Sequence, residues 1–124
     1  MDGKKINAVK EYFEDKKTNF LTEAVFLSSD SRLDEAVFAK IQMNVYDIFN
    51  TLFSVAIKSC ESNPDEVRDY FLKKTEEIPA NWLISLRRAE QYGDMKKVHI
   101  EQIKLDTAER IRNEFRELWE ASYD

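Results

Sequence analysis

The chain has 124 residues, of which 43% are hydrophobic and 35% are charged, and its net charge is −5. This length fits a single domain over residues 1–124 with one core. The composition is too apolar for a disordered chain and too interrupted by charge for a membrane protein, and the acidic balance argues against general attraction to nucleic acid. With only two glycines and two prolines, turn residues are too few for many short strands. We therefore expect an all-α, single-domain bundle of four to six helices.

The first segment, 4–27, carries apolar residues at helical spacing. Ile6, Val9 and Phe13 recur every three or four residues, and the same spacing continues after the polar pair at 18–19. This pattern predicts either one helix with a weak point at that pair or two short helices.

The next segment, Arg32 to Cys60, is predicted to be the central helix. Ser31 lies three residues before Asp34, which is the spacing of a helix cap. At 100° per residue, its polar residues share one stripe about 80° wide, and apolar side chains cover most of the remaining circumference. A helix that is apolar over so wide an arc needs neighbours on several sides.

Two further boundaries are indicated by helix-capping residues and by prolines. Asn63 can cap a helix whose first residue is Pro64 and whose third is Glu66. Pro79 lacks a backbone donor, and we expect it to stop or kink that helix. A separate helix is then predicted from Ala80 to about Tyr92.

The last part of the chain, Ala80 to Ala121, is predicted to form an antiparallel helical hairpin packed on the central helix. Gly93 can adopt the left-handed conformation that ends a helix, and Asp94 can cap the one that follows. In the final helix, Val98 and Leu105 lie off the main apolar stripe, about 140° to 160° round the helix from Ile100. We take these two residues as candidates for a partner-binding surface, and we expect replacement of both by Asp to abolish association without unfolding the chain.

The residues available for chemistry are few. His99 is the only histidine and Cys60 the only cysteine, so conventional zinc ligands are lacking. Cys60 lies on the apolar side of its helix, as expected of a small core residue with an unreactive thiol. No Gly-rich phosphate loop is present. We expect no catalytic residues, no metal and no cofactor, and we expect the protein not to be an enzyme.

Basic residues gather around the predicted turn at Gly93. Arg87 and Arg88 precede it, and Lys96, Lys97 and His99 follow. Ala89 lies four residues before Gly93, a spacing that resembles that of a helix-turn-helix, but acidic residues interleaved with the basic ones dilute the positive charge. Arg87 and Arg88 are candidate partner contacts, and nucleic acid is not the expected partner.

Aromatic residues make up 12% of the chain, which is rich for a small helical domain. Core packing explains most of them, but some are candidates for an apolar pocket or an interface. The residues in question are Phe38, Phe49, Phe53, Trp82 and Trp119.

Three functional hypotheses follow from these patterns. The leading one is a small cytoplasmic interaction protein, a regulator, an inhibitor or an assembly subunit, that binds another protein or a second copy of itself. The compartment is inferred from the single Cys60 and from an N-terminal segment without the apolar run of a secretion signal. The alternatives are a bundle that binds an apolar ligand or catalyses a reaction through carboxylates, and a DNA-binding regulator that uses the hairpin from Arg87 to His99.

Overall fold

The structure, a computed structural model, describes residues 3–30 and 32–121. Within them the chain forms four helices and no strand. The helices are α1 (Gly3–Ser29), α2 (Leu33–Ser59), α3 (Pro64–Gln91) and α4 (Met95–Ala121). The predicted all-α bundle is confirmed, with four helices at the low end of the expected number.

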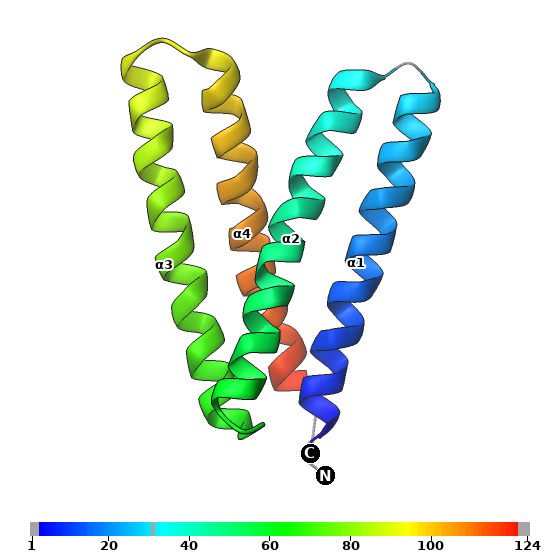
Figure 1. The fold of residues 1–124 in the computed structure, drawn as a ribbon, viewed down its shortest axis with the longest axis vertical. Coiled ribbons are helices and arrows are strands. Elements are labelled where there is room, and N and C mark those ends of the chain that lie inside the picture. The colour runs from blue at the N-terminus through cyan, green and yellow to red at the C-terminus, as the bar shows by residue number, and fades with distance from the viewer. Residues whose placement is uncertain (1–2, 31, 122–124) are drawn as a thin grey trace.

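The four helices form two antiparallel hairpins, α1 with α2 and α3 with α4 (Figure 1). The hairpins lie together at the end where the chain begins and ends, which we call the closed end. They diverge toward the opposite, open end, where α1 turns into α2 and α3 turns into α4. Both α2 and α4 contact each of the other three helices. The predicted central helix is therefore confirmed, and α4 shares its position.

The main core contains at least one fully buried phenylalanine from each helix. Phe71 of α3 lies 4.4 Å from Phe115 of α4, 5.6 Å from Phe53 of α2 and 6.0 Å from Phe13 of α1, measured between ring centroids. All four rings are at most 1% exposed. Aromatic rings bury large areas and interact at these separations, so this cluster holds the two hairpins together.

A second, smaller cluster belongs to the α1–α2 hairpin alone and lies nearer the open end. Ala24 and Leu27 of α1 are buried with Ala36 and Ala39 of α2. Small side chains let two helices approach closely. The hairpin is therefore packed internally there, without the shared core that joins the two hairpins at the closed end.

Of the two alternatives for the first segment, the single helix is confirmed, whereas the separate helix predicted to begin at Ala80 is wrong. α1 continues through Thr18 and Asn19, where the Thr22 hydroxyl donates a 2.9 Å hydrogen bond to the Thr18 carbonyl. α3 continues through Pro79 to Gln91, so the region after Ala80 is not a separate helix. A proline removes one helical hydrogen bond. Packing on both sides of it, where Ile78 and Trp82 both lie against the main core, outweighs that loss.

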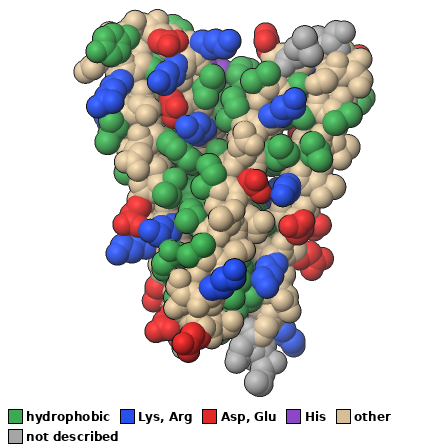
Figure 2. Space-filling model, in the orientation of Figure 1, with side chains coloured by type: hydrophobic (Ala, Val, Ile, Leu, Met, Phe, Trp, Pro, Cys, Tyr) green, Lys and Arg blue, Asp and Glu red, His purple; other side chains and the backbone are tan. Residues whose placement is uncertain are grey.

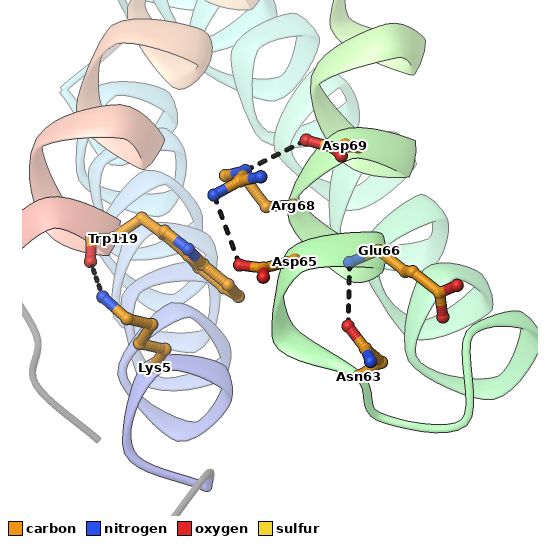
Figure 3. Close-up of polar contacts among 7 residues, drawn as sticks. All are labelled: Lys5, Asn63, Asp65, Glu66, Arg68, Asp69 and Trp119. Atoms are coloured by element: carbon orange, nitrogen blue, oxygen red, sulfur yellow. Dashed lines mark hydrogen bonds and ion pairs between the residues drawn. The ribbon is translucent and has the colours of Figure 1, made fainter.

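The predicted caps of α3 and α4 are confirmed. The Asn63 side chain accepts a 3.2 Å hydrogen bond from the backbone N–H of Glu66 (Figure 3). Gly93 has a φ of +68°, and Asp94 accepts a 3.2 Å hydrogen bond from the backbone N–H of Lys97. The cap predicted at Ser31 lies outside the described residues.

The closed end also has polar links between distant parts of the chain. Lys5 donates a hydrogen bond to the backbone carbonyl of Trp119, and its ammonium group lies 5.6 Å from the centroid of the Trp119 ring (Figure 3). These contacts join the start of α1 to the end of α4.

Candidate functional site

A cleft of about 590 Å³ lies between α2 and α4 at the open end. The cleft results from the divergence of the two hairpins, which we call the α1–α2 arm and the α3–α4 arm. α2 and α4 are the helices of the two arms that lie next to each other. In the space-filling view, the surface is hollowed between the arms and hydrophobic side chains gather there (Figure 2). The lining residues are Asp34, Val37 and Phe38 from α2 and Met95, Lys96, His99 and Ile100 from α4.

The two walls of the cleft meet at an aromatic pair. The rings of Phe38 and His99 are edge to face, with centroids 4.7 Å apart and planes inclined by 64°. Beside this pair, Val37 is 49% exposed and Met95 is 70% exposed. The cleft therefore presents apolar surface that no other part of the described chain covers.

A second hollow, of about 230 Å³, continues between the same two helices. Ile100 lines both hollows, so we treat them together as the α2–α4 groove. The other residues of the second hollow are Ile41, Asn44, Val45, Ile48 and Lys104.

Two lysines, Lys96 and Lys104, line the groove, and three contacts fix the position of Lys104. Its ammonium nitrogen lies 4.8 Å from the centroid of the Trp82 ring, and 3.2 Å and 3.3 Å from the two carboxylate oxygens of Glu101. Glu101 is only 6% exposed. A buried carboxylate needs a paired charge, so Lys104 stabilises Glu101 and cannot turn freely toward a ligand.

The groove combines apolar walls with a few polar and charged groups. His99 is its only imidazole. Over residues 3–30 and 32–121, no three side chains of the His, Cys, Asp and Glu types are grouped so as to hold a metal ion. Apolar walls with a few charged groups at the rim are typical of sites that bind an apolar surface.

A partly buried polar cluster that sequence reasoning missed joins α1, α2 and α4. Tyr12 donates a 2.5 Å hydrogen bond to Glu114, Tyr46 donates one of 3.4 Å to the same oxygen, and Lys16 lies 3.8 Å from the other carboxylate oxygen. Burial, reinforced by the hydrogen bond to Glu114, raises the pKa of Tyr12 far above its usual value, and burial also raises the pKa of Tyr46. Tyr12 and Glu114 are 102 residues apart in sequence, so no local pattern could have paired them.

The predicted aromatic candidates are divided between the core and the groove. Phe49 and Phe53 are fully buried, and Trp119 is 5% exposed and stacks on Phe115. Trp82 is half-buried, with its ring centroid 6.3 Å from that of Phe49. Phe38 alone of this set lines the groove.

The predicted partner-contact residues lie on the α3–α4 hairpin. Val98 and Leu105 of α4 are half-buried, and neither lines the groove. Arg87 and Arg88 are exposed near the end of α3. Sequence reasoning missed Val37, Met95 and Ile100 as a group, because nothing in their spacing shows that α2 and α4 face each other.

The α3–α4 hairpin does not have the geometry of a helix-turn-helix. Its helices run antiparallel (Figure 1), whereas the two helices of that motif cross at about 90–120°. The resemblance in spacing around Gly93 therefore does not extend to the arrangement of the helices.

None of the four described helices has an apolar stretch of the length needed to cross a lipid bilayer. Comparisons with models of protein families, with curated proteins and with solved structures each gave no match.

Proposed function

We propose that this chain is a small interaction module, a cytoplasmic regulator or assembly subunit without enzymatic activity, and that it binds its partner protein at the open end. The proposal is carried by the distribution of exposed hydrophobic side chains. Of the ten large hydrophobic residues that are exposed in the described part of the chain, eight lie in the half of the molecule near the open end. They are Leu21, Val25, Phe26, Val37, Leu83, Ile84, Tyr92 and Met95.

Exposure of apolar surface to water is unfavourable, and association with a partner removes that surface from water. Phe26 is 62% exposed, Val25 is 60% exposed and Met95 is 70% exposed, although the main core toward the closed end buries five phenylalanines completely. The contrast between the two ends supports a reserved contact surface at the open end. The α2–α4 groove lies between the exposed residues of the α1–α2 hairpin and those of the α3–α4 hairpin.

Two variants test this proposal, a double variant at the groove and a single variant elsewhere on α2. Val37→Asp and Met95→Asp, combined in one variant, place two charges at the groove, whereas Val55→Asp alters a residue of α2 that is 39% exposed and lies outside both hollows. In affinity capture from the source cells followed by mass spectrometry, we expect the groove variant to lose a protein that the wild type and Val55→Asp retain. Circular dichroism checks that both variants are folded. Equal capture by all three proteins would show that the open end is not the binding surface.

A second candidate function is the binding of an apolar small ligand in the groove. The observation that favours it is the cleft volume of about 590 Å³, because ligand pockets commonly measure about 300–1,000 Å³. Lys104 lines the groove and lies over the Trp82 ring, so a bound ligand is expected to change Trp82 fluorescence. A Trp119→Phe variant isolates the Trp82 signal. An unchanged spectrum across a panel of fatty acids and aromatic compounds would exclude this candidate for those ligand classes.

A further inference from the structure

We propose that the partner at the open end is a second copy of this chain, related by a twofold axis. In this dimer the α1–α2 arm of each copy lies against the α3–α4 arm of the other. The inference rests on the proposed function, because it names the occupant of the same surface.

The two arms carry opposite charge. Within about ten residues of its turn, the α1–α2 arm has four acidic side chains, Glu23, Asp30, Asp34 and Glu35, against Arg32 and Lys40. Arg32 is already paired with Glu35. Glu23, Asp30 and Asp34 are exposed and form no ion pair with the described residues. This acidic arm therefore has negative charge available for a partner.

The corresponding part of the α3–α4 arm is basic, with Arg87, Arg88, Lys96, Lys97 and Lys104. The first four are exposed and form no ion pair with any described residue. Two of the three acidic residues in this stretch are occupied within the arm. Asp94 caps α4, and Glu101 is buried beside Lys104.

The opposite charges do not neutralise each other within one molecule. No ion pair among the described residues joins the two arms at the open end, because the hairpins diverge there. A twofold axis relates identical surfaces, so a contact between the acidic arm of one copy and the basic arm of the other necessarily occurs twice. A second copy is thus complementary to both arms at once.

The exposed hydrophobic residues are divided evenly between the arms. Leu21, Val25, Phe26 and Val37 lie on the acidic arm, and Leu83, Ile84, Tyr92 and Met95 lie on the basic arm. Each of the two equivalent contacts would therefore combine apolar side chains from both arms with charges around them. An apolar centre with a polar rim is the usual composition of a protein interface.

The total surface also fits an association of this size. A compact protein of 14.7 kDa is expected to expose about 6,900 Å², but this chain exposes 7798 Å². The surplus, roughly 850 Å², is close to the area of about 800 Å² that each partner contributes to a standard interface. A second copy at the open end would bring the surface per chain back to that of a compact protein.

Light scattering on the purified full chain is the first test. At low ionic strength and at concentrations from about 1 to 200 µM, a range that reveals micromolar affinity, we expect a mass twice the chain mass of 14.7 kDa. A monomer throughout this range would overturn the inference.

Charge reversal of one arm at a time tests the orientation. Lys96→Glu with Lys97→Glu makes both arms acidic, and Asp30→Lys with Asp34→Lys makes both arms basic. Each double variant should dimerise at least about tenfold more weakly than the wild type, since like charges then face each other. A 1:1 mixture of the two variants should form a heterodimer, because every contact again joins an acidic arm to a basic one. Circular dichroism confirms that each variant is folded.

A matched control reverses two charges away from the open end. Lys10→Glu with Lys73→Glu changes exposed side chains of α1 and α3, and its dimer affinity should stay within about threefold of the wild type.

Failure of the mixed variants to form a heterodimer would overturn the proposed orientation. If the wild type is a monomer but captures another protein that the groove variant does not capture, the second copy is refuted as the partner. The proposed function as an interaction module would still stand.

Discussion

The rings of Phe38 and His99 meet edge to face with their centroids 4.7 Å apart, and this contact joins α2 to α4 at the open end. Both residues also line the cleft. The second hollow of the groove lies on the side of this pair that is nearer the closed end, and on the side nearer the open end Val37 and Met95 are exposed.

Phe38→Ala should lower the free energy of unfolding by about 1–2 kcal/mol, since the half-buried ring loses its contact with His99 and part of its apolar burial. Urea denaturation measures this change. Phe26→Ala, at a residue that is 62% exposed, is the control and should change stability by less than about 0.5 kcal/mol. A loss for Phe38→Ala as large as that for a core phenylalanine would show that Phe38 is not at the edge of a groove.

Phe71→Ala should cost about 3–5 kcal/mol, the range for deleting a buried phenylalanine. Phe71 is fully buried and its ring lies near those of Phe13, Phe53 and Phe115, so the cavity would open where all four helices meet. The free energy of unfolding in urea measures the loss. A cost below about 1 kcal/mol would contradict the central position of this ring in the core.

Tyr12→Phe should change how stability depends on alkaline pH. The folded state raises the pKa of Tyr12 above the ordinary value of 10.0, so its stabilising contribution is present at neutral pH and is lost as pH rises beyond about 10. There the unfolded chain releases a proton that the folded chain retains, and stability falls by about 1.4 kcal/mol per pH unit for one such group. The slope of unfolding free energy between about pH 10 and 11.5 should therefore be shallower in Tyr12→Phe than in the wild type.

The control for that experiment is Tyr92→Phe, because Tyr92 is 85% exposed at the open end. This variant should keep the wild-type slope. Equal slopes in Tyr12→Phe and the wild type would show that Tyr12 does not hold its proton in the folded state. At neutral pH, Tyr12→Phe should also cost about 1–2 kcal/mol, since Glu114 loses its closest donor.

Pro79→Ala should stabilise the protein by about 1–3 kcal/mol, because an interior proline costs a helix about 3 kcal/mol relative to alanine. Pro79 lies inside α3 and is half-buried, so the loss of its ring contacts offsets part of the gain. Thermal or urea unfolding measures the difference. A destabilised variant would indicate that packing of the proline ring matters more than the missing hydrogen bond.

Helix ends were predictable wherever their cause lies within a few residues. Asn63 and Gly93 act through their own side chain or backbone conformation, and both boundaries were predicted correctly. Pro79 misled the prediction, since its local penalty is real but is outweighed by the core contacts of Ile78 and Trp82. Contacts with other helices cannot be read from one helix alone.

The candidate site was predictable only in part. Phe38 was among the aromatic candidates and does line the groove, whereas Phe49 and Phe53, on the same helix, are enclosed by the main core. All three are apolar and spaced for a helix, so periodicity could not separate them. What distinguishes Phe38 from Phe49 and Phe53 is its position nearer the open end. The open end is defined only by the arrangement of the two hairpins in the folded structure.

The sequence by itself determined that this chain forms amphipathic helices, and it determined two of the turns between them. Those features depend on hydrogen bonds and side-chain spacing within a few residues. Only the tertiary structure decided that the two hairpins meet at one end and diverge at the other. The angle between the two hairpins depends on how Phe13, Phe53, Phe71 and Phe115, from four different helices, pack together. This angle determines which apolar side chains remain exposed for a partner.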